Sequence, residues 1–517
     1  MNRIKDMNVS KKKESILVWI GAEFLHYFIV NGLQKKYDAD YYAIIDVTNN
    51  PKEFFEVQKL VGFKKIWFYH DEIKFSENSP DLDYLKEFEI KNNIDLWKIA
   101  LNERIFYRFN NFHKFSSDEI LKIDEMSIRF FHRVLDEINP DYFLTKVPSF
   151  HHLELFKEMC KKTKCKILML SPPKLGYKTL LSEDATTIDY FSESESIPSK
   201  QRNFLELREY LNSYSSHSQL KQFYKKIENR NSRNDMNIAI DYLKSSNKNI
   251  KTNYNYYGRT KFKVLSDIFL SKIRKKVREN YLDKNLLKNV NLKKSFVYFP
   301  MATDLERYLL IDSPFHTNQI EIIRHIAKSI PTDYEVYVKE NPSNVTRDWR
   351  EISQYKEILE IPNVKLIHPA FSNKELLSNC SLVISIAGTS SFEAAFYEKP
   401  SIVFGNVLYK ELPSVNKSEN IERLPQMIRD VLNQKVHAED LNKFLTILEK
   451  NTFDFDMAEF VRLISEKFYS NDASVDVKIN ESDVIDFINE NQTSLELLIK
   501  KHLEKIHQHK NFVLKSS

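Results

Sequence analysis

Short apolar runs alternate with longer amphipathic segments over the first 190 residues of the chain. The apolar runs are rich in β-branched and aromatic residues, which is typical of buried strands. They occupy residues 16–20, 41–46, 64–69, 141–145 and 166–170. Helical patterns lie between them, at residues 24–35, 120–137 and 153–162. Strands that alternate with helices predict a doubly wound parallel sheet, so residues 1–190 are expected to form a Rossmann-like domain.

The same alternation returns after residue 295. Strands are expected at residues 296–300, 334–338, 364–367, 382–386 and 401–404. Helices are expected at residues 318–329, 373–379 and 392–397. Residues 295–435 therefore predict a second Rossmann-like domain, and residues 436–517 predict a helical extension. The fold class is α/β, with two such domains facing each other across a cleft.

Residues 191–294 interrupt the pattern between the two predicted domains. They are polar, with helical stretches at 204–214 and 264–281. Residues 217–294 contain 20 Lys+Arg and 6 Asp+Glu, while the whole chain has a net charge of +5. This asymmetry favours an anionic partner, such as a membrane surface or a phosphorylated lipid. The alternative is a solvated helical insertion between the domains.

Composition narrows the class of protein further. With 517 residues and 42% hydrophobic positions, the chain is typical of a globular protein of two or three domains. The mild net charge and the absence of a recognition motif argue against nucleic acid as a partner. The three cysteines, Cys160, Cys165 and Cys380, lack metal-site spacing and indicate reduced thiols in a cytoplasm. Residues 16–30 are too short and too interrupted to span a bilayer, so no transmembrane segment is expected.

The stretch 381–405 carries the clearest candidate chemistry. Gly388 and the hydroxyl residues Thr389, Ser390 and Ser391 follow a strand and precede a helix, whose expected N-cap is Ser390 or Ser391. Ligands bind beyond the carboxyl ends of parallel strands, and helix N-termini attract phosphate. We expect Gly388 to be required by the geometry of this turn. The alternative is an ordinary β-α-β crossover.

Other strand ends supply further candidates. Glu393 lies one turn into the helix of that stretch, within reach of a ribose diol. Glu23 and His26 follow the first strand and are expected to face the cleft, where either can be a general base. The alternative is that Glu23 caps the helix and His26 is partly buried. The loop 171–177 also leaves a strand end and is expected near the same cleft, and Lys339 is placed to neutralise a phosphate, unless it faces solvent.

Four sequence blocks of the second domain carry a family resemblance. They read YFPMATDLER, DYEVYVKENPS, NVKLIHP and SIAGTSSFEAAFYEKPSIVFG. Their order resembles the capsule polysaccharide biosynthesis family, bacterial glycosyltransferases related to the Kdo transferases that build capsule lipid linkers. The resemblance covers residues 295–415 and is weaker over 16–190, where LMLSPPKLGYKTLLSED is similar to the end of the family's first domain. It implies a GT-B architecture.

The resemblance implies a nucleotide-sugar donor held by the second domain. Gly388, Thr389 and Ser390 match the family's GTxGxEA loop, and Glu393 matches its Glu. Lys339, Glu340 and Pro342 match the family's KEHP block, and His368 lies in the block that ends in HP. These four residues are further donor-binding candidates. Asn341 and Ser391 are also donor-binding candidates, but the family usually has His at the first of these positions and Gly at the second. An amide donates a hydrogen bond but carries no charge, so CMP-Kdo is not assumed as the donor.

The expected function is a glycosyltransferase that moves a sugar from a nucleotide donor to a glycan or lipid-linked acceptor. No cofactor is expected beyond this co-substrate, and no metal, because the chain lacks a convincing Asp-x-Asp site. The expected location is cytoplasmic, with the basic segment 217–294 as a link to the inner face of the membrane. Two alternatives stay open: a CDP-polyol phosphotransferase of the same architecture, and a non-catalytic nucleotide- or glycan-binding member, which Asn341 favours.

Overall fold

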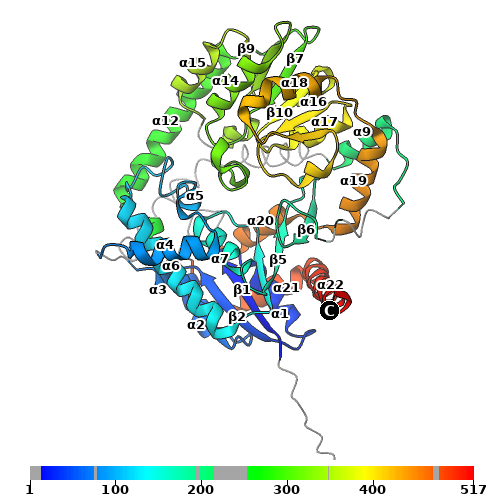
Figure 1. Cartoon of the computed structure of the whole chain (residues 1–517). Helices are drawn as coiled ribbons and strands as arrows, with labels where there is room; N and C mark the ends of the chain where they lie inside the picture. The colour runs from blue at the N-terminus through cyan, green and yellow to red at the C-terminus, as the bar shows by residue number, and fades with distance from the viewer. Residues whose placement is uncertain are drawn as a thin grey trace, which may run out of the picture.

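The computed structural model describes residues 13–74, 78–189, 191, 198–214, 253–346, 349–469 and 477–516. The structure contains two sheets with helices on both faces, one above the other in Figure 1. This is the GT-B-like α/β fold that the sequence predicts. Residues 215–252, which hold part of the predicted basic insertion, lie outside the described residues.

The first sheet has a Rossmann core. Its described strands lie in the order β13-β6-β5-β4-β1-β2-β3. The strands are β1 (Ser15–Gly21), β2 (Asp40–Asp46), β3 (Lys65–Phe68), β4 (Tyr142–Lys146), β5 (Lys166–Ser171), β6 (Lys178–Ser182) and β13 (Thr452–Asp454). The strands from β5 to β3 pair in parallel, in the order typical of half a Rossmann fold. β6 and β13 extend it as antiparallel strands, with Phe453 opposite Thr179.

Helices cover both faces of this sheet. They are α1 (Leu25–Leu33), α2 (Asn49–Val57), α3 (Tyr69–Glu72), α4 (Leu82–Asn92), α5 (Leu96–Ala100), α6 (Ser117–Ile138) and α7 (His151–Cys160). β1 separates two apolar clusters: Val18 and Ile20 face the first, and Leu17 and Trp19 face the second. A strand buried on both faces has no polar side to alternate with, which explains its uninterrupted apolar run.

The second sheet is parallel throughout its described strands, in the order β12-β11-β10-β7-β8-β9. The strands are β7 (Phe296–Pro300), β8 (Glu335–Lys339), β9 (Val364–Ile367), β10 (Leu382–Ser385), β11 (Ser401–Val403) and β12 (Val415–Lys417). The helices around it are α13 (Arg307–Leu310), α14 (Gln319–Ser329), α15 (Ile352–Leu359), α16 (Asn373–Asn379), α17 (Thr389–Phe396), α18 (Leu424–Leu432) and α19 (Ala438–Asn451). The strand order reverses between β7 and β10, which is where a doubly wound sheet opens a binding crevice.

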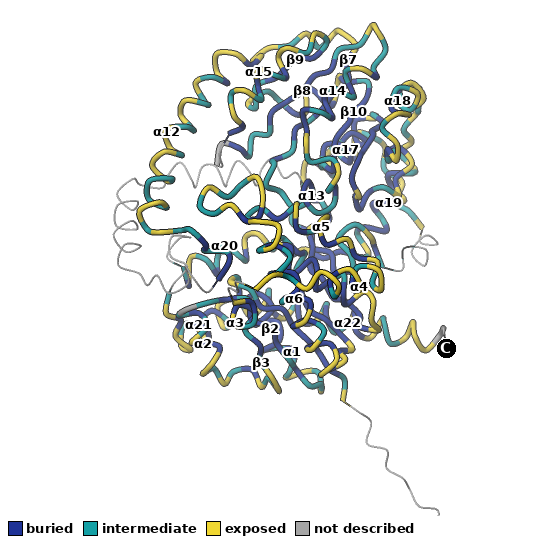
Figure 2. The backbone as a smooth tube through the Cα atoms, turned by 60° about the vertical axis from the view of Figure 1, so that its left-hand side comes forward, coloured by how far each residue is buried: buried dark blue, intermediate teal, exposed yellow. Residues whose placement is uncertain are grey.

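Two helices connect the sheets, and both were predicted. α9 (Phe204–Ser213) packs into the core of the second domain through Leu207 and Leu211. α12 (Lys261–Asn285) runs along one side of the molecule, and much of its surface is exposed (Figures 1 and 2). No helix within the described residues is both long enough and apolar enough to cross a bilayer.

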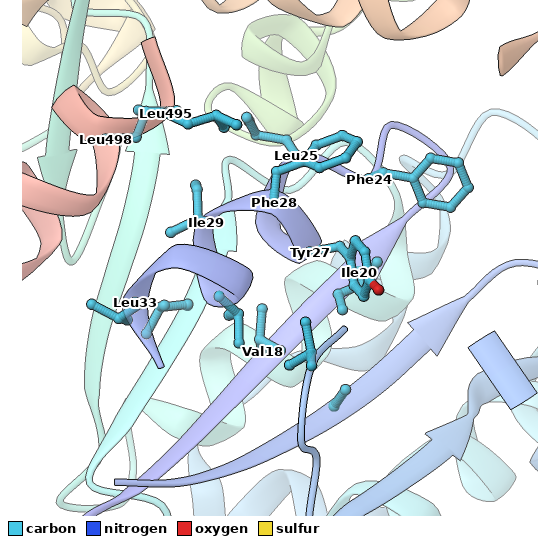
Figure 3. Close-up of a cluster of buried hydrophobic side chains, with 14 of the residues drawn as sticks. Val18, Ile20, Phe24, Leu25, Tyr27, Phe28, Ile29, Leu33, Leu495 and Leu498 are labelled. Atoms are coloured by element: carbon cyan, nitrogen blue, oxygen red, sulfur yellow. The ribbon is translucent and has the colours of Figure 1, made fainter. Parts of the chain in front are cut away.

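The C-terminal segment corrects the predicted helical extension. α19 packs against the second domain, but β13 then joins the first sheet, and the helices that follow cover that domain. These helices are α20 (Met457–Phe468), α21 (Glu481–Glu490) and α22 (Gln492–Ser516). Figure 3 shows Leu495 and Leu498 of α22 in the same cluster as Phe28 and Val18. Residues 436–517 therefore do not form a separate extension.

Candidate active site

A cavity of about 520 Å³ lies between the two domains. The carboxyl ends of β7, β8 and β10 form one wall, at the point where the strand order of the second sheet reverses. Lys174 and Tyr177, from the loop after β5, and the first half of α20 form the opposite wall. A volume of this size is typical of small-molecule sites. The prediction that the loop 171–177 borders the cleft is confirmed.

The N-terminus of α17 points into this cavity. The helix begins at Thr389, and its N-cap is Gly388, which offers no side-chain cap. The predicted N-caps Ser390 and Ser391 are therefore wrong, because the helix starts earlier. Thr389 and Ser390 line the cavity, whereas Ser391 is buried, with its Oγ 2.7 Å from Ser385 Oγ. The first N–H groups of α17 and these two hydroxyls form an anion-binding end.

Gly388 does not need to be glycine for its backbone. Its φ is −80° and its ψ is 153°, an extended conformation that any residue adopts. A Cβ atom added there lies 3.6 Å from the Ser385 Cβ, which is an ordinary contact. The expectation that the turn geometry requires glycine is therefore wrong. What the glycine provides is space at the mouth of the helix.

Lys339 and Glu393 form a charged pair within the cavity wall. Burial lowers the pKa of Lys339 to about 8, against the opposing charge of Glu393. Burial raises the pKa of Glu393, partly offset by a hydrogen bond from Thr389 and the charge of Lys339. The Asn373 Nδ2 donates to Glu393 Oε2 at 3.3 Å. The cavity therefore holds a buried cation beside the N-terminus of a helix, as phosphate recognition requires.

Glu340 has a structural role at the base of the cavity. Its carboxylate is fully buried and accepts hydrogen bonds from Tyr355 Oη at 2.8 Å and Arg350 Nε at 3.1 Å. Arg350 also donates to Asp304 and to the carbonyl of Ala302. The Glu340 side chain thus ties the loops after β7 and β8 together beneath the cavity. Glu340 also lines the cavity, so its contact with a donor stays a prediction.

Asn341 sits at the cavity wall in the first turn after β8. Its Oδ1 accepts a hydrogen bond from the backbone N of Ser343 at 2.9 Å, which closes a turn around Pro342. Its carbonyl oxygen is therefore used within the loop, and its amide N–H groups are the part that can face a ligand. The turn contact seen here and the predicted donor contact are therefore compatible.

Substitution of Asn341 by aspartate separates these roles. Asn341→Asp keeps the oxygen that accepts from Ser343 but replaces the amide donor with a negative charge. We expect nucleotide affinity to fall at least tenfold, about 1.4 kcal/mol, with an unchanged melting temperature. Asn341→Ala loses both contacts and is expected to lower affinity and melting temperature together. Calorimetric titration with nucleotide measures the first quantity. Wild-type affinity in Asn341→Asp would leave Asn341 as a turn residue only.

Three predicted site residues lie away from the cavity. His368 follows β9 at the far edge of the sheet, where its Nε2 is 3.4 Å from Asp283 Oδ1. His26 is buried, and burial together with the neighbouring His502 lowers its pKa to about 3. The expectation that His26 faces the cleft is wrong, because α22 covers that side of α1. Glu23 pairs with Lys146 at the end of β4 and does not line the cavity.

Lys174 reaches this site from the first domain. Its φ is +67°, a left-handed conformation that is rare for residues other than glycine. Its ammonium lies over the ring of Tyr308, and burial lowers its pKa to about 7 despite the charges of Glu306 and Asp312. Gly176, two residues on, has φ +52°, and a Cβ there would lie 2.5 Å from the carbonyl oxygen of Tyr214. This loop is therefore held tightly against the cleft.

The sequence analysis did not single out Lys174, Arg350 or α20. Asp456, Glu459 and Arg462 of α20 line the cavity although they lie far from the donor blocks in sequence. The position of Lys174 after the end of a strand could have indicated this residue. No feature of the sequence indicated that α20 lines the cavity. Within the described ranges, no group of three or more His, Cys, Asp or Glu side chains is arranged to hold a metal ion.

The two α/β domains, with a cavity between them that is lined by the N-terminus of α17 and by charged side chains, have the GT-B-like fold. Residues 188–423 match the family model described as capsule polysaccharide biosynthesis protein. The resemblance seen in the sequence blocks is thus confirmed over these residues. No curated protein sequence matches the chain.

Solved structures resemble the chain only distantly. The β-Kdo 2,7 transferase of Thermosulfurimonas dismutans KpsC is 13% identical, with a TM-score of 0.30, and the match covers 72% of this chain and 98% of that one. The UDP-GlcNAc 2-epimerase of Methanocaldococcus jannaschii, in complex with UDP-GlcNAc and UDP, is 14% identical at a TM-score of 0.24, covering 84% and 99%. A glycosyltransferase from Rickettsia africae is 12% identical at 0.23, covering 88% and 99%. At these TM-scores the likeness adds nothing to the fold seen directly.

Proposed function

We propose that this protein is a glycosyltransferase of capsule polysaccharide biosynthesis, which transfers a sugar from a nucleotide-sugar donor to a glycan or lipid-linked acceptor. The observation that carries the proposal is the cavity between the domains. It brings together the N-terminus of α17, the buried cation Lys339 and, from the other domain, Lys174. These groups suit the phosphates of a nucleotide-sugar, and the match of residues 188–423 to the family model supports a role in capsule synthesis.

The proposed reaction needs charge stabilisation at the leaving group. The bond between the anomeric carbon and the donor phosphate breaks, and the nucleotide leaves with the electron pair. An acceptor hydroxyl forms the new bond to that carbon and releases its proton to solvent water. Negative charge grows on the departing phosphate, where the α17 N–H groups and the ammonium of Lys339 lower its energy. Lys174 adds a second positive charge from the acceptor side of the cleft.

The reaction is proposed to be metal-independent. In many nucleotide-sugar enzymes a divalent cation balances the phosphate charge, but here a helix N-terminus and two lysines occupy the cavity wall. The proposal also includes a cytoplasmic location, where nucleotide-sugars are available.

A donor panel tests the proposal. Purified full-length protein is incubated with CMP-, UDP-, GDP- and CDP-linked sugars, and with CDP-glycerol, and released nucleotide is measured with and without EDTA. Turnover of one sugar donor that survives EDTA is expected. Turnover of CDP-glycerol alone would indicate polyol phosphate transfer instead. Nucleotide binding without any turnover, in the presence of glycan acceptors, would indicate a non-catalytic member.

A further inference from the structure

α12 exposes six large apolar side chains, and four of them, Phe262, Phe269, Ile273 and Val277, form a stripe on one face. The exposed fractions of these four side chains are 81%, 66%, 48% and 52%. Because an α-helix turns about 100° per residue, positions spaced by seven and four fall on one face. Single exposed apolar residues are ordinary on protein surfaces, but an aligned row along a helix marks an interaction surface. We call it the α12 stripe.

Basic residues flank the α12 stripe on both sides. At about 100° per residue, Lys263 and Arg274 fall on one side of it and Lys272 and Lys276 on the other. The acidic residues within the helix are paired: Asp267 accepts from Arg274, Glu279 accepts from Trp349 Nε1, and Asp283, beyond the end of the stripe, accepts from Lys288. An apolar face between two basic edges is the pattern of a helix that lies in the plane of a membrane surface.

Both ends of α12 are fixed, so the stripe is not a loose segment. Before the helix, Tyr254 is buried in the first domain, where its hydroxyl lies 3.0 Å from His152 Nδ1. At the other end, Leu282 and Leu286 are buried in the core of the second domain. Figure 2 shows the exposed surface of α12 between these two anchors. The fold therefore holds the α12 stripe at the surface of the protein.

The charge pattern selects among possible occupants. A second copy of the chain would place two basic helices against each other, which is repulsive. Nucleic acid would neutralise the lysines but leave Phe262 and Phe269 in water. An anionic lipid surface satisfies both features, because the lysines meet the headgroups while the apolar side chains enter the boundary of the acyl region.

We propose that α12 is an interfacial helix that holds this protein on an anionic membrane surface, with the α12 stripe inserted. α12 runs from the first domain to the second along one side of the molecule (Figure 1), so this contact would hold both domains at the membrane, where lipid-linked acceptors lie. The proposal deepens the proposed function by naming the surface on which the acceptor is met. Its evidence is separate, since membrane binding requires neither donor nor turnover.

Vesicle binding by the full-length chain tests the proposal. Sedimentation is compared between vesicles of phosphatidylcholine alone and vesicles with equal phosphatidylcholine and phosphatidylglycerol. Binding to the anionic vesicles only, weakening as salt rises, is expected. Lys263→Gln combined with Lys276→Gln should weaken it about 30-fold. The same change at the exposed pair Lys328 and Lys356, on the second domain, is the matched control and should have little effect.

A separate experiment tests whether the α12 stripe inserts into the membrane. Phe269→Trp places a fluorophore in it, and brominated lipid is expected to quench that emission. Phe262→Ser combined with Phe269→Ser should weaken vesicle binding tenfold or more while the fold and donor turnover in solution are kept. Equal binding to both vesicle types, or none to either, overturns the proposal. Binding to a DNA oligonucleotide that competes with vesicles, without quenching of Phe269→Trp, would assign the surface to nucleic acid and also overturn it.

Discussion

Replacement of Lys339 by methionine is expected to lower turnover of the nucleotide donor by two to three orders of magnitude. The reason is the position of the ammonium, which is buried in the cavity wall beside the N-terminus of α17. Removal of one group that stabilises developing charge in a water-poor site typically costs this much. Methionine keeps most of the apolar stem, so the melting temperature should change little. Lys365→Met, on the neighbouring strand β9, is the control and should keep wild-type turnover.

The same residue predicts how nucleotide binding depends on pH. The pKa of Lys339 is lowered to about 8, so the ammonium is charged below that pH and neutral above it. Bound phosphate favours the charged form, and affinity should therefore fall as pH rises through about 8. Lys339→Arg stays charged and should remove this fall. Lys174, with a pKa near 7, produces an earlier fall that Lys339→Arg leaves in place. Wild-type affinity that is flat from pH 6 to 9 would contradict both assignments.

Replacement of Arg350 by methionine is expected to have the largest effect on stability. Arg350 and Glu340 are both buried, and Glu340 would keep its charge without its main partner. Breaking one side of a buried ion pair typically costs about 3–5 kcal/mol of the free energy of unfolding. Urea unfolding, followed by the fluorescence of the adjacent Trp349, measures this. Arg350→Met combined with Glu340→Gln removes both charges and should recover a large part of the loss.

A surface ion pair provides the matched control for this prediction. Arg324 pairs with Glu321 and Glu357 on the outside of the second domain, where its side chain is 35% exposed. Arg324→Met should lower stability far less than Arg350→Met, because water and salt screen an exposed ion pair. If Arg350→Met is as mild as Arg324→Met, the network beneath the cavity does not support the loop after β8.

The strands were predictable because their side chains are buried on both faces of the sheet. β7 occupies residues 296–300 as expected, and β1 and β5 differ from the predicted bounds by one residue. In each, burial on both faces selects an apolar run that is visible in the sequence. The strand–turn–helix unit around Gly388 was predictable for the same reason, since strand order and strand ends place it at the reversal of the sheet.

The features that the sequence did not predict involve residues whose surroundings are formed by segments far away along the chain. Glu340 became a donor candidate through its match to the family's KEHP block, but its buried partners Arg350 and Tyr355 become visible only when the loop folds back. His26 looked accessible because nothing near it in sequence predicts that α22 covers α1. α20 borders the cavity because β13 returns the chain to the first sheet. The local sequence pattern does not indicate that a later segment of the chain packs back onto the first domain.

That return also has a consequence for synthesis on the ribosome. The first domain needs β13 as its edge strand and α22 against α1, and both are made only after the whole second domain has emerged. The nascent first domain therefore exposes Phe28, Ile29 and Leu33 while some 300 further residues are translated, at roughly 5–20 residues per second. Its apolar surface stays uncovered for tens of seconds. Chaperone dependence during expression, and release from it once residue 506 has left the exit tunnel, follow from this order of assembly.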